Sequence, residues 1–172
     1  LVLQDITDFD WQGVDYLLIS PAIPHTDETV KAAQHAGVAL INDVDLLQDA
    51  APEATKIAIT GTRGKSTVVA LIAHVLRFAG HTVAVGGHMG KPPLAIPVLK
   101  KGEIYVLEIA AQQLETMQTF HPDVAVFLNI SPEHLLLWRR ENSLRIMMFG
   151  MKDGSLITQL PALTLKLFKS IS

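Results

Sequence analysis

The sequence predicts an α/β fold built on a mostly parallel, doubly wound sheet. Short apolar runs rich in β-branched residues recur along the chain, as expected for strands buried in a parallel sheet. Segments with helical spacing of apolar residues alternate with these runs. One run also leads through closely spaced glycines directly into a helical segment. In such a sheet we expect ligands to bind beyond the carboxyl ends of the strands.

The first fifty residues have the pattern of a βαβ unit. Apolar runs predict the strands, the acidic first turn and Thr26 as N-cap predict the first helix, and Asp43 opens a short second one. In chain order, the predicted elements are a strand at Tyr16–Ile19, a helix at Thr26–Ala36, a strand at Val38–Ile41 and a helix at Asp43–Asp49.

A second unit follows a segment without periodicity at residues 50–55, which we interpret as a linker. Its first strand, at 56–60, precedes a helix whose apolar residues keep helical spacing as far as Gly80. The remaining predicted elements are strands at Thr82–Val85, Ile104–Ile109 and Val124–Ile130, and a short helix at Gln113–Thr119. No element is predicted beyond Leu135.

Composition and charge exclude several classes of function. The net charge of −3 gives no reason to expect binding to nucleic acid or to an anionic membrane. There is no Cys for disulfides or thiolate metal sites, and no apolar run approaches the roughly 18 residues of a membrane span. We therefore expect no membrane insertion. Because the sequence begins with Leu1 and not with Met, we expect a segment upstream of it.

The stretch Gly61–Thr67 has the layout of a phosphate-binding loop, in which glycines let backbone N–H groups approach phosphate oxygens. Lys65 supplies a positive charge, and Ser66 supplies a hydroxyl that can bind Mg²⁺. The loop departs from the general pattern because Ile59 stands where the first glycine is usual. The alternative is an ordinary turn between strand and helix, with a surface lysine.

Further polar residues follow other predicted strands. Glu108 lies inside an otherwise apolar strand, where a carboxylate is costly unless it is paired or bound to metal. It is predicted either to face Mg²⁺ at the phosphate loop or to pair with a Lys or Arg. Asn129 to His134 follow the last strand, and Gly86–Gly90 form either a second ligand-facing loop or a flexible turn.

Five motifs, in order and in spacing, resemble those of the Mur ligase family, and especially of its members that add D-glutamate. The loop resembles the family's G-T-N-G-K-S-T. The other matches are Ser20–Pro24 with S-P-G-I-P, Gly87–Gly90 with G-N-I-G, Glu108–Glu115 with E-x-S-S-x-Q-L-E, and Asn129–Leu135 with N-x-T-x-D-H-L.

The resemblance implies an ATP-dependent and Mg²⁺-dependent ligase of peptidoglycan synthesis. Its substrates would be UDP-N-acetylmuramoyl-L-alanine and D-glutamate, joined through an acyl phosphate. Residues Gly61, Thr62, Arg63, Gly64, Lys65, Ser66 and Thr67 would bind ATP. Lys65 and His134 would be catalytic, Ser66, Glu108 and His134 would bind metal, and His88 would face the substrate.

The resemblance also assigns domains. Residues 1–50 match the C-terminal part of the UDP-binding domain, and residues 54–172 match part of the central ATP-binding domain, with no recognisable match after about residue 136. It implies a cytoplasmic monomer. Since the family's remaining domains are not found in these residues, we expect a fragment or degenerate copy that does not complete the reaction alone.

Several positions depart from the family pattern. Arg63 replaces an asparagine, Ala110–Ala111 replace a serine pair, and Glu133 replaces an aspartate. The family's carbamylated lysine has no clear equivalent, because Phe149 lies near its position and Lys152 is out of register. Three alternatives therefore stay open: a nucleotide-binding pseudo-enzyme, a related ligase with another acceptor, and an inactive truncated product.

Overall fold

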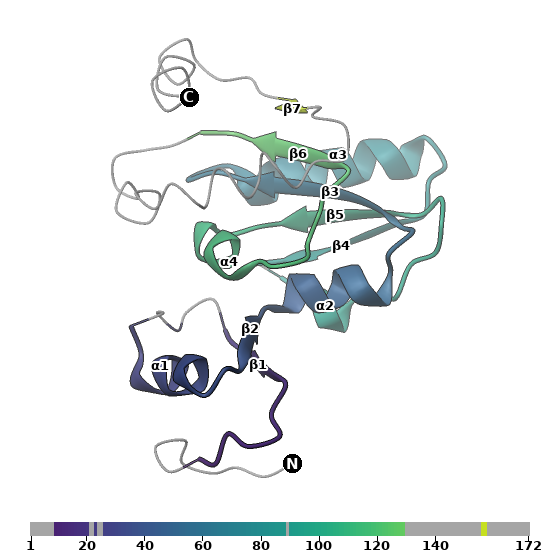
Figure 1. The fold of residues 1–172 in the computed structure, drawn as a ribbon. Coiled ribbons are helices and arrows are strands. Elements are labelled where there is room, and N and C mark those ends of the chain that lie inside the picture. The colour runs from purple at the N-terminus through teal and green to yellow at the C-terminus, as the bar shows by residue number, and fades with distance from the viewer. Residues whose placement is uncertain (1–8, 21–22, 24–25, 89, 130–155, 158–172) are drawn as a thin grey trace.

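The computed structural model describes residues 9–20, 23, 26–88, 90–129 and 156–157 (Figure 1). Its helices and strands, in chain order, are β1 (Tyr16–Leu18), α1 (Glu28–His35), β2 (Ala39–Ile41), α2 (Asp43–Ala50), β3 (Thr55–Thr60), α3 (Lys65–Phe78), β4 (Val83–Gly87), the 3₁₀ helix η2 (Pro93–Ala95), β5 (Ile104–Glu108), α4 (Ala111–Thr116), β6 (Val124–Phe127) and β7 (Leu156–Ile157).

Two parallel sheets organise the described residues. The larger has the strand order β4-β5-β3-β6-β7, and the smaller pairs β1 with β2. In the larger sheet, β3 lies between β5 and β6, so Ile59 is in register with Glu108 on one side and with Val126 on the other. The predicted parallel α/β fold is confirmed, and β3 holds the middle position from which the glycine-rich turn leaves.

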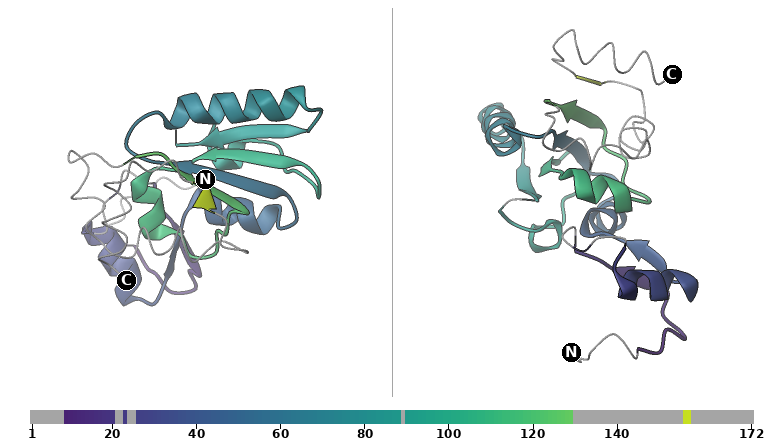
Figure 2. Two further views of the ribbon diagram at one scale, coloured as in Figure 1. Left: turned by 90° about the horizontal axis from the view of Figure 1, so that it is seen from above. Right: turned by 90° about the vertical axis from the view of Figure 1, so that its left-hand side faces the viewer.

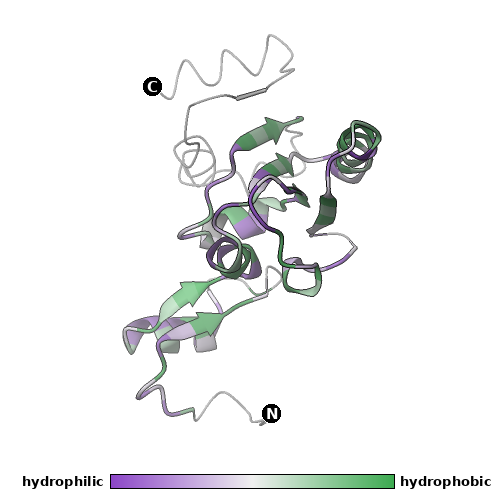
Figure 3. Ribbon diagram, turned by 90° about the vertical axis from the view of Figure 1, so that its right-hand side faces the viewer, coloured by the Kyte–Doolittle hydropathy of each residue, from purple (hydrophilic) through white to green (hydrophobic). Residues whose placement is uncertain are grey.

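Helices cover both faces of the larger sheet, as a doubly wound fold requires (Figure 2). On one face, Val69 and Ala73 of α3 pack on Ile59 of β3 and on Val106 of β5. On the other face, the core is formed by α2, α4 and the 96–99 segment against the strands. The strands between these layers are mostly hydrophobic (Figure 3), because both of their faces are buried.

The smaller sheet carries α1, which packs through Val30 on Ile19 and Leu40. The helix begins at Glu28 and not at the predicted Thr26. Its N-cap is Asp27, whose carboxylate accepts a hydrogen bond from the backbone N–H of Thr29 at 2.9 Å. The prediction of Thr26 as the capping residue is therefore wrong, because Asp27 caps the helix through the Thr29 N–H.

A capping box begins α2. The Asn42 side chain accepts hydrogen bonds from the backbone N–H groups of Val44 and Asp45, and the Asp45 carboxylate accepts one from Asn42. Val44 and Leu47 of this helix belong to the core of the larger sheet. The predicted domain limits, 1–50 and 54–172, stay a prediction. The helix α2 belongs to the first range in sequence, but its apolar side chains pack on the sheet of the second range.

The helix α4 begins and ends earlier than the predicted Gln113–Thr119. Its start is fixed by Gln113, whose side-chain oxygen accepts a hydrogen bond from the Ala110 N–H at 3.0 Å. Its end is fixed by the buried Asp45 carboxylate of α2, which accepts hydrogen bonds from the backbone N–H groups of residues 118, 119 and 120. Those groups therefore do not continue the helix.

The predicted strand ends also shift. The strand β4 runs to Gly87, two residues beyond the prediction, and β6 ends at Phe127 instead of Ile130. The single turn η2 was not predicted. Among the residues that the structure describes, no helix combines the length and the apolar character needed to span a bilayer.

Candidate functional site

The predicted strand, glycine turn and helix are all present at residues 55–78. The chain leaves β3 at Thr60, turns through residues 61–64 and enters α3 at Lys65. Gly61 has a φ of +142°, and a Cβ there would lie 3.1 Å from the backbone nitrogen and oxygen of Asn129. The positive φ favours glycine at this position, and the close approach to the segment after β6 leaves little room for a side chain.

Lys65 lies across the turn that it follows. Its Nζ donates hydrogen bonds to the carbonyl oxygens of Gly61, at 2.9 Å, and Thr62, at 3.3 Å. The ammonium group is therefore held beside the first turn of α3, where backbone N–H groups lack partners within the helix and carry positive partial charge. This combination favours an anion at the loop, with phosphate as the anion that such loops usually bind.

Glu108 ends β5 next to the start of α3. Glu108 is only 3% exposed, and its Oε2 accepts a hydrogen bond from Ser66 Oγ at 2.7 Å. Within the described residues, no Lys or Arg side chain forms an ion pair with Glu108, so the predicted alternative is not seen there. A hydroxyl and a carboxylate side by side are oxygen ligands of the kind that Mg²⁺ prefers, so the pair fits a magnesium ion.

His88 lies at the same edge of the sheet as Glu108. Its backbone N–H donates to the Glu108 carbonyl oxygen at 2.8 Å, and the residue is exposed. The preceding Gly87, with a φ of +124°, has no room for a Cβ, which would overlap the backbone of Glu108. Glu108 and His88 thus lie at the carboxyl ends of neighbouring strands, and Ser66, at the start of α3, contacts Glu108.

Asn129 contacts the loop through both its side chain and its backbone. The Arg63 N–H donates to Asn129 Oδ1 at 3.0 Å, and Asn129 Nδ2 donates to the Arg63 carbonyl at 2.9 Å. The Thr62 N–H donates to the Asn129 carbonyl at 3.0 Å. The sequence analysis assigned Asn129 no role of its own, and the available signal was its place at the end of a predicted strand.

Two further parts of the predicted site give different outcomes. His134 and Glu133 lie outside the described residues, so their roles stay predictions. Ala110 is buried two residues after the end of β5 and Ala111 opens α4, so neither position supplies a side-chain hydroxyl. Among the described residues, no three His, Cys, Asp or Glu side chains come together as a metal cluster. A magnesium ion here would depend largely on phosphate and water ligands.

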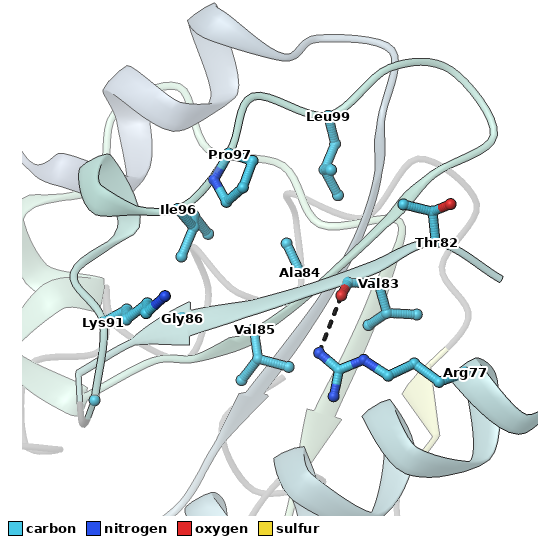
Figure 4. Close-up of a pocket in the computed structure, with 11 residues that line it drawn as sticks. Arg77, Thr82, Val83, Ala84, Val85, Gly86, Lys91, Ile96, Pro97 and Leu99 are labelled. Carbon is cyan, nitrogen blue, oxygen red and sulfur yellow. Dashed lines mark hydrogen bonds between the residues drawn. The ribbon is translucent and has the colours of Figure 1, made fainter.

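A hollow of about 570 Å³ lies elsewhere, along the edge strand β4 (Figure 4). It is bounded by β4, the end of α3 and residues 90–99, with Arg77 and Lys91 at its sides. The Arg77 guanidinium donates to the Val83 carbonyl oxygen at 3.0 Å. None of the predicted site residues lines this hollow, and we assign the site to the loop edge because the charged groups meet there.

Comparison with known proteins gives a family match over the part that holds the loop. Residues 59–140 match the Mur ligase middle domain. The UDP-N-acetylmuramoylalanine–D-glutamate ligase of Caulobacter sp. (strain K31) is 43% identical over 141 residues, which cover 76% of this chain and 30% of that protein. The ligase of the same name from Rickettsia prowazekii is 42% identical over 130 residues, covering 76% and 29%.

Solved structures show the same fold. The crystal structure of UDP-N-acetylmuramate:L-alanyl-gamma-D-glutamyl-meso-diaminopimelate ligase from Neisseria meningitides superposes with a TM-score of 0.58 at 16% identity, over 90% of this chain and 55% of that one. A murein peptide ligase from Psychrobacter arcticus gives a TM-score of 0.55 at 14% identity, over 91% and 38%. The chain spans about 30% of the length of the curated relatives it matches.

Proposed function

Because the chain belongs to the Mur ligase family through its middle domain at residues 59–140, we propose that its loop Gly61–Thr67 binds ATP with Mg²⁺ in an amide-forming ligase. One observation carries the proposal: the loop joins β3 to α3 in such a way that Ser66 Oγ lies 2.7 Å from the Glu108 carboxylate. A cation-binding pair thus stands directly beside a turn suited to phosphate.

The proposed substrates are UDP-N-acetylmuramoyl-L-alanine and D-glutamate, which would be joined in peptidoglycan synthesis. The names of the curated relatives state this pair, and the identity of about 40% supports the same choice here. The proposal places the chain in the cytoplasm, as a monomer. The absence of Cys is compatible with that reducing compartment.

In the first step, a carboxylate oxygen of the alanine attacks the γ-phosphorus of ATP, the bond to the bridging oxygen breaks, and ADP leaves. Lys65 and the N–H groups that open α3 would stabilise the negative charge on the transferred phosphoryl group. Ser66 and Glu108 would hold the magnesium ion, which neutralises charge on the β- and γ-phosphate oxygens. The product of this step is an acyl phosphate.

In the second step, the amine nitrogen of D-glutamate attacks the acyl carbon, inorganic phosphate leaves, and the amine gives up a proton. The exposed His88 would contact the UDP-linked substrate, next to Glu108. His134 would act as a catalytic residue and as part of a second metal site. Both assignments rest on the family resemblance.

A second candidate is a nucleotide-binding pseudo-enzyme that binds ATP without transferring its phosphate. The observation that favours it is the pair Ala110–Ala111, which replaces the family's two serines and begins two residues after Glu108. Loss of these hydroxyls removes two hydrogen-bonding groups beside the proposed metal while leaving the loop intact.

The test is turnover of ATP by the 172-residue chain with Mg²⁺ and both proposed substrates. A ligase releases ADP and phosphate in step with the amide product, and only when both substrates are present. Lys65→Ala should abolish this release. ATP binding without phosphate release by the unaltered chain would fit both the pseudo-enzyme and a ligase that does not complete the reaction alone, whereas ATP affinity left unchanged by Lys65→Ala would contradict the proposed role of the loop.

A further inference from the structure

The side-chain amide of Asn129 contacts both the backbone N–H and the backbone C=O of one residue of the phosphate loop, Arg63. Oδ1 accepts from the Arg63 N–H at 3.0 Å, while Nδ2 donates to the carbonyl oxygen of the same residue at 2.9 Å. The arrangement reproduces the double hydrogen bond that opposite residues exchange in an antiparallel sheet. It extends the pairing of β3 with β6 beyond Leu128, whose N–H donates to the Thr60 carbonyl.

Few side chains can make this contact. It requires one donor and one acceptor side by side, which only the amides of Asn and Gln provide. Aspartate offers the acceptor alone, and its charge would face the Arg63 carbonyl oxygen. The contact uses only the backbone atoms of residue 63. It therefore does not require a particular side chain at this position, and arginine can replace the family's asparagine without breaking it.

The contact also determines which loop donors remain for a ligand. The N–H groups of Thr62 and Arg63 are directed to Asn129. The N–H groups that open α3 are left to bind an anion, because helix geometry gives them no partner within the helix. Asn129 therefore holds the turn through two of its backbone N–H groups, while those at the start of α3 stay available to an anion.

We propose that Asn129 is a positioning residue that holds the phosphate loop in the conformation that binds nucleotide. The identity of the ligand, ATP with Mg²⁺, rests on the proposed function above. The holding contact itself does not, since it exists between protein atoms alone. The two claims can therefore be tested separately.

The experiment compares Asn129→Ala with Asp123→Ala in the 172-residue chain. Asp123 stands at the other end of β6, where its carboxylate accepts a hydrogen bond from the Lys56 N–H at 2.8 Å. Both changes remove a side-chain contact between the β6 and β3 segments, but only one touches the loop. Calorimetric titration gives MgATP affinity, thermal unfolding gives stability, and amide hydrogen exchange reports on Arg63.

We expect Asn129→Ala to weaken MgATP binding at least about tenfold and to speed exchange of the Arg63 amide. The Thr62 amide should remain protected, because its acceptor is the backbone of residue 129. Asp123→Ala should lower the unfolding temperature and leave MgATP affinity within about twofold. Asn129→Asp should not restore binding, because it lacks the donor.

Unchanged MgATP affinity in Asn129→Ala would overturn the proposal. If the unaltered chain binds no MgATP, the proposed function fails, and the exchange measurement then decides the positioning role by itself. In that case, faster exchange of Arg63 with protected Thr62 supports the role. Unchanged exchange of Arg63 overturns it.

Discussion

At the residue scale, the contact between Ser66 and Glu108 links the loop to the neighbouring strand. The carboxylate is buried, and the Ser66 hydroxyl is the hydrogen-bond donor to it within the described residues. A buried carboxylate is costly unless paired, so the two residues depend on each other before any metal binds. The same two oxygens are the proposed ligands of the magnesium ion.

Replacing Ser66 with Ala removes one of the two proposed magnesium ligands. We expect ATP affinity in the presence of Mg²⁺ to fall at least about tenfold, roughly 1.4 kcal/mol, while affinity in the presence of EDTA changes little. Titrations of ATP with and without Mg²⁺ check this. Ser66→Thr keeps a hydroxyl and should keep the magnesium dependence. An unchanged magnesium dependence in Ser66→Ala would remove Ser66 from the metal site.

Sequence reasoning at this scale found Lys65, Ser66 and Glu108, because each breaks an otherwise regular pattern. A lysine after glycines and a carboxylate inside an apolar strand both need a physical reason. Asn129 was not given a role, because an asparagine after a strand is common and its partner is a backbone group 66 positions away. Every residue has a backbone N–H and C=O, so the sequence does not indicate which of them a distant side chain contacts.

At the element scale, β4 and β5 approach each other closely at their carboxyl ends. Gly87 is in register with Glu108, and a Cβ at Gly87 would overlap the Glu108 backbone. Glycine therefore allows the strand that carries His88 to lie beside the strand that carries Glu108. This close approach brings two of the predicted site residues to one edge.

Gly87→Ala should destabilise the chain by about 4 kcal/mol or more, since a backbone overlap forces the two strands apart. Gly102→Ala is the matched control, because Gly102 also has a positive φ, of +86°, but no atoms within 4 Å of its would-be Cβ. The control should cost only about 1–2 kcal/mol of backbone strain. Urea unfolding measures the free energy of unfolding of both variants. An equal loss of stability in the two would contradict the prediction, because it would mean that the overlap at Gly87 costs little.

Asp43, the first residue of α2, should make the stability of the chain depend on pH. Burial raises the pKa of the Asp43 carboxyl above its ordinary value of 3.8, and the hydrogen bond from Gln113 only partly opposes this. The folded chain then binds a proton more tightly than the unfolded chain. The contribution of Asp43 to stability is complete below pH 3.8 and is lost as the pH rises through the raised pKa.

Asp43→Asn should therefore reduce the loss of stability between about pH 4 and neutral pH. Urea unfolding at several pH values over that range gives the slope of the unfolding free energy against pH. Asp49→Asn, at an exposed position of the same helix, is the control and should leave the slope close to that of the unaltered chain. A slope that is the same in all three proteins would contradict the assignment to Asp43.

The elements themselves were predictable where a local pattern decides them. Apolar runs predicted the strands β1 to β6, and helical spacing predicted α3, whereas β7 lies in a stretch for which no element was predicted. The end of α4 was not predictable, because the N–H groups of residues 118–120, just beyond it, donate to Asp45, more than seventy positions away. The single turn η2 is too short for any period to be recognised.

At the scale of the whole molecule, the strand order explains why the site residues meet. β3 lies between β5 and β6, so the turn after β3 is flanked by Glu108 on one side and Asn129 on the other. All these strands are parallel, and their carboxyl ends therefore share one edge. The alternation of strands and helices predicted this edge, but it did not predict the order of the strands.

The central claim is that this edge binds ATP through Lys65, and titration of MgATP into the 172-residue chain tests it most directly. We expect saturable one-to-one binding that Lys65→Ala abolishes. Lys101→Ala, which removes a lysine side chain that is 82% exposed and outside the loop, should bind as the unaltered chain does. Equal MgATP affinity in Lys65→Ala and in the unaltered chain would contradict the assignment of the loop as the nucleotide site.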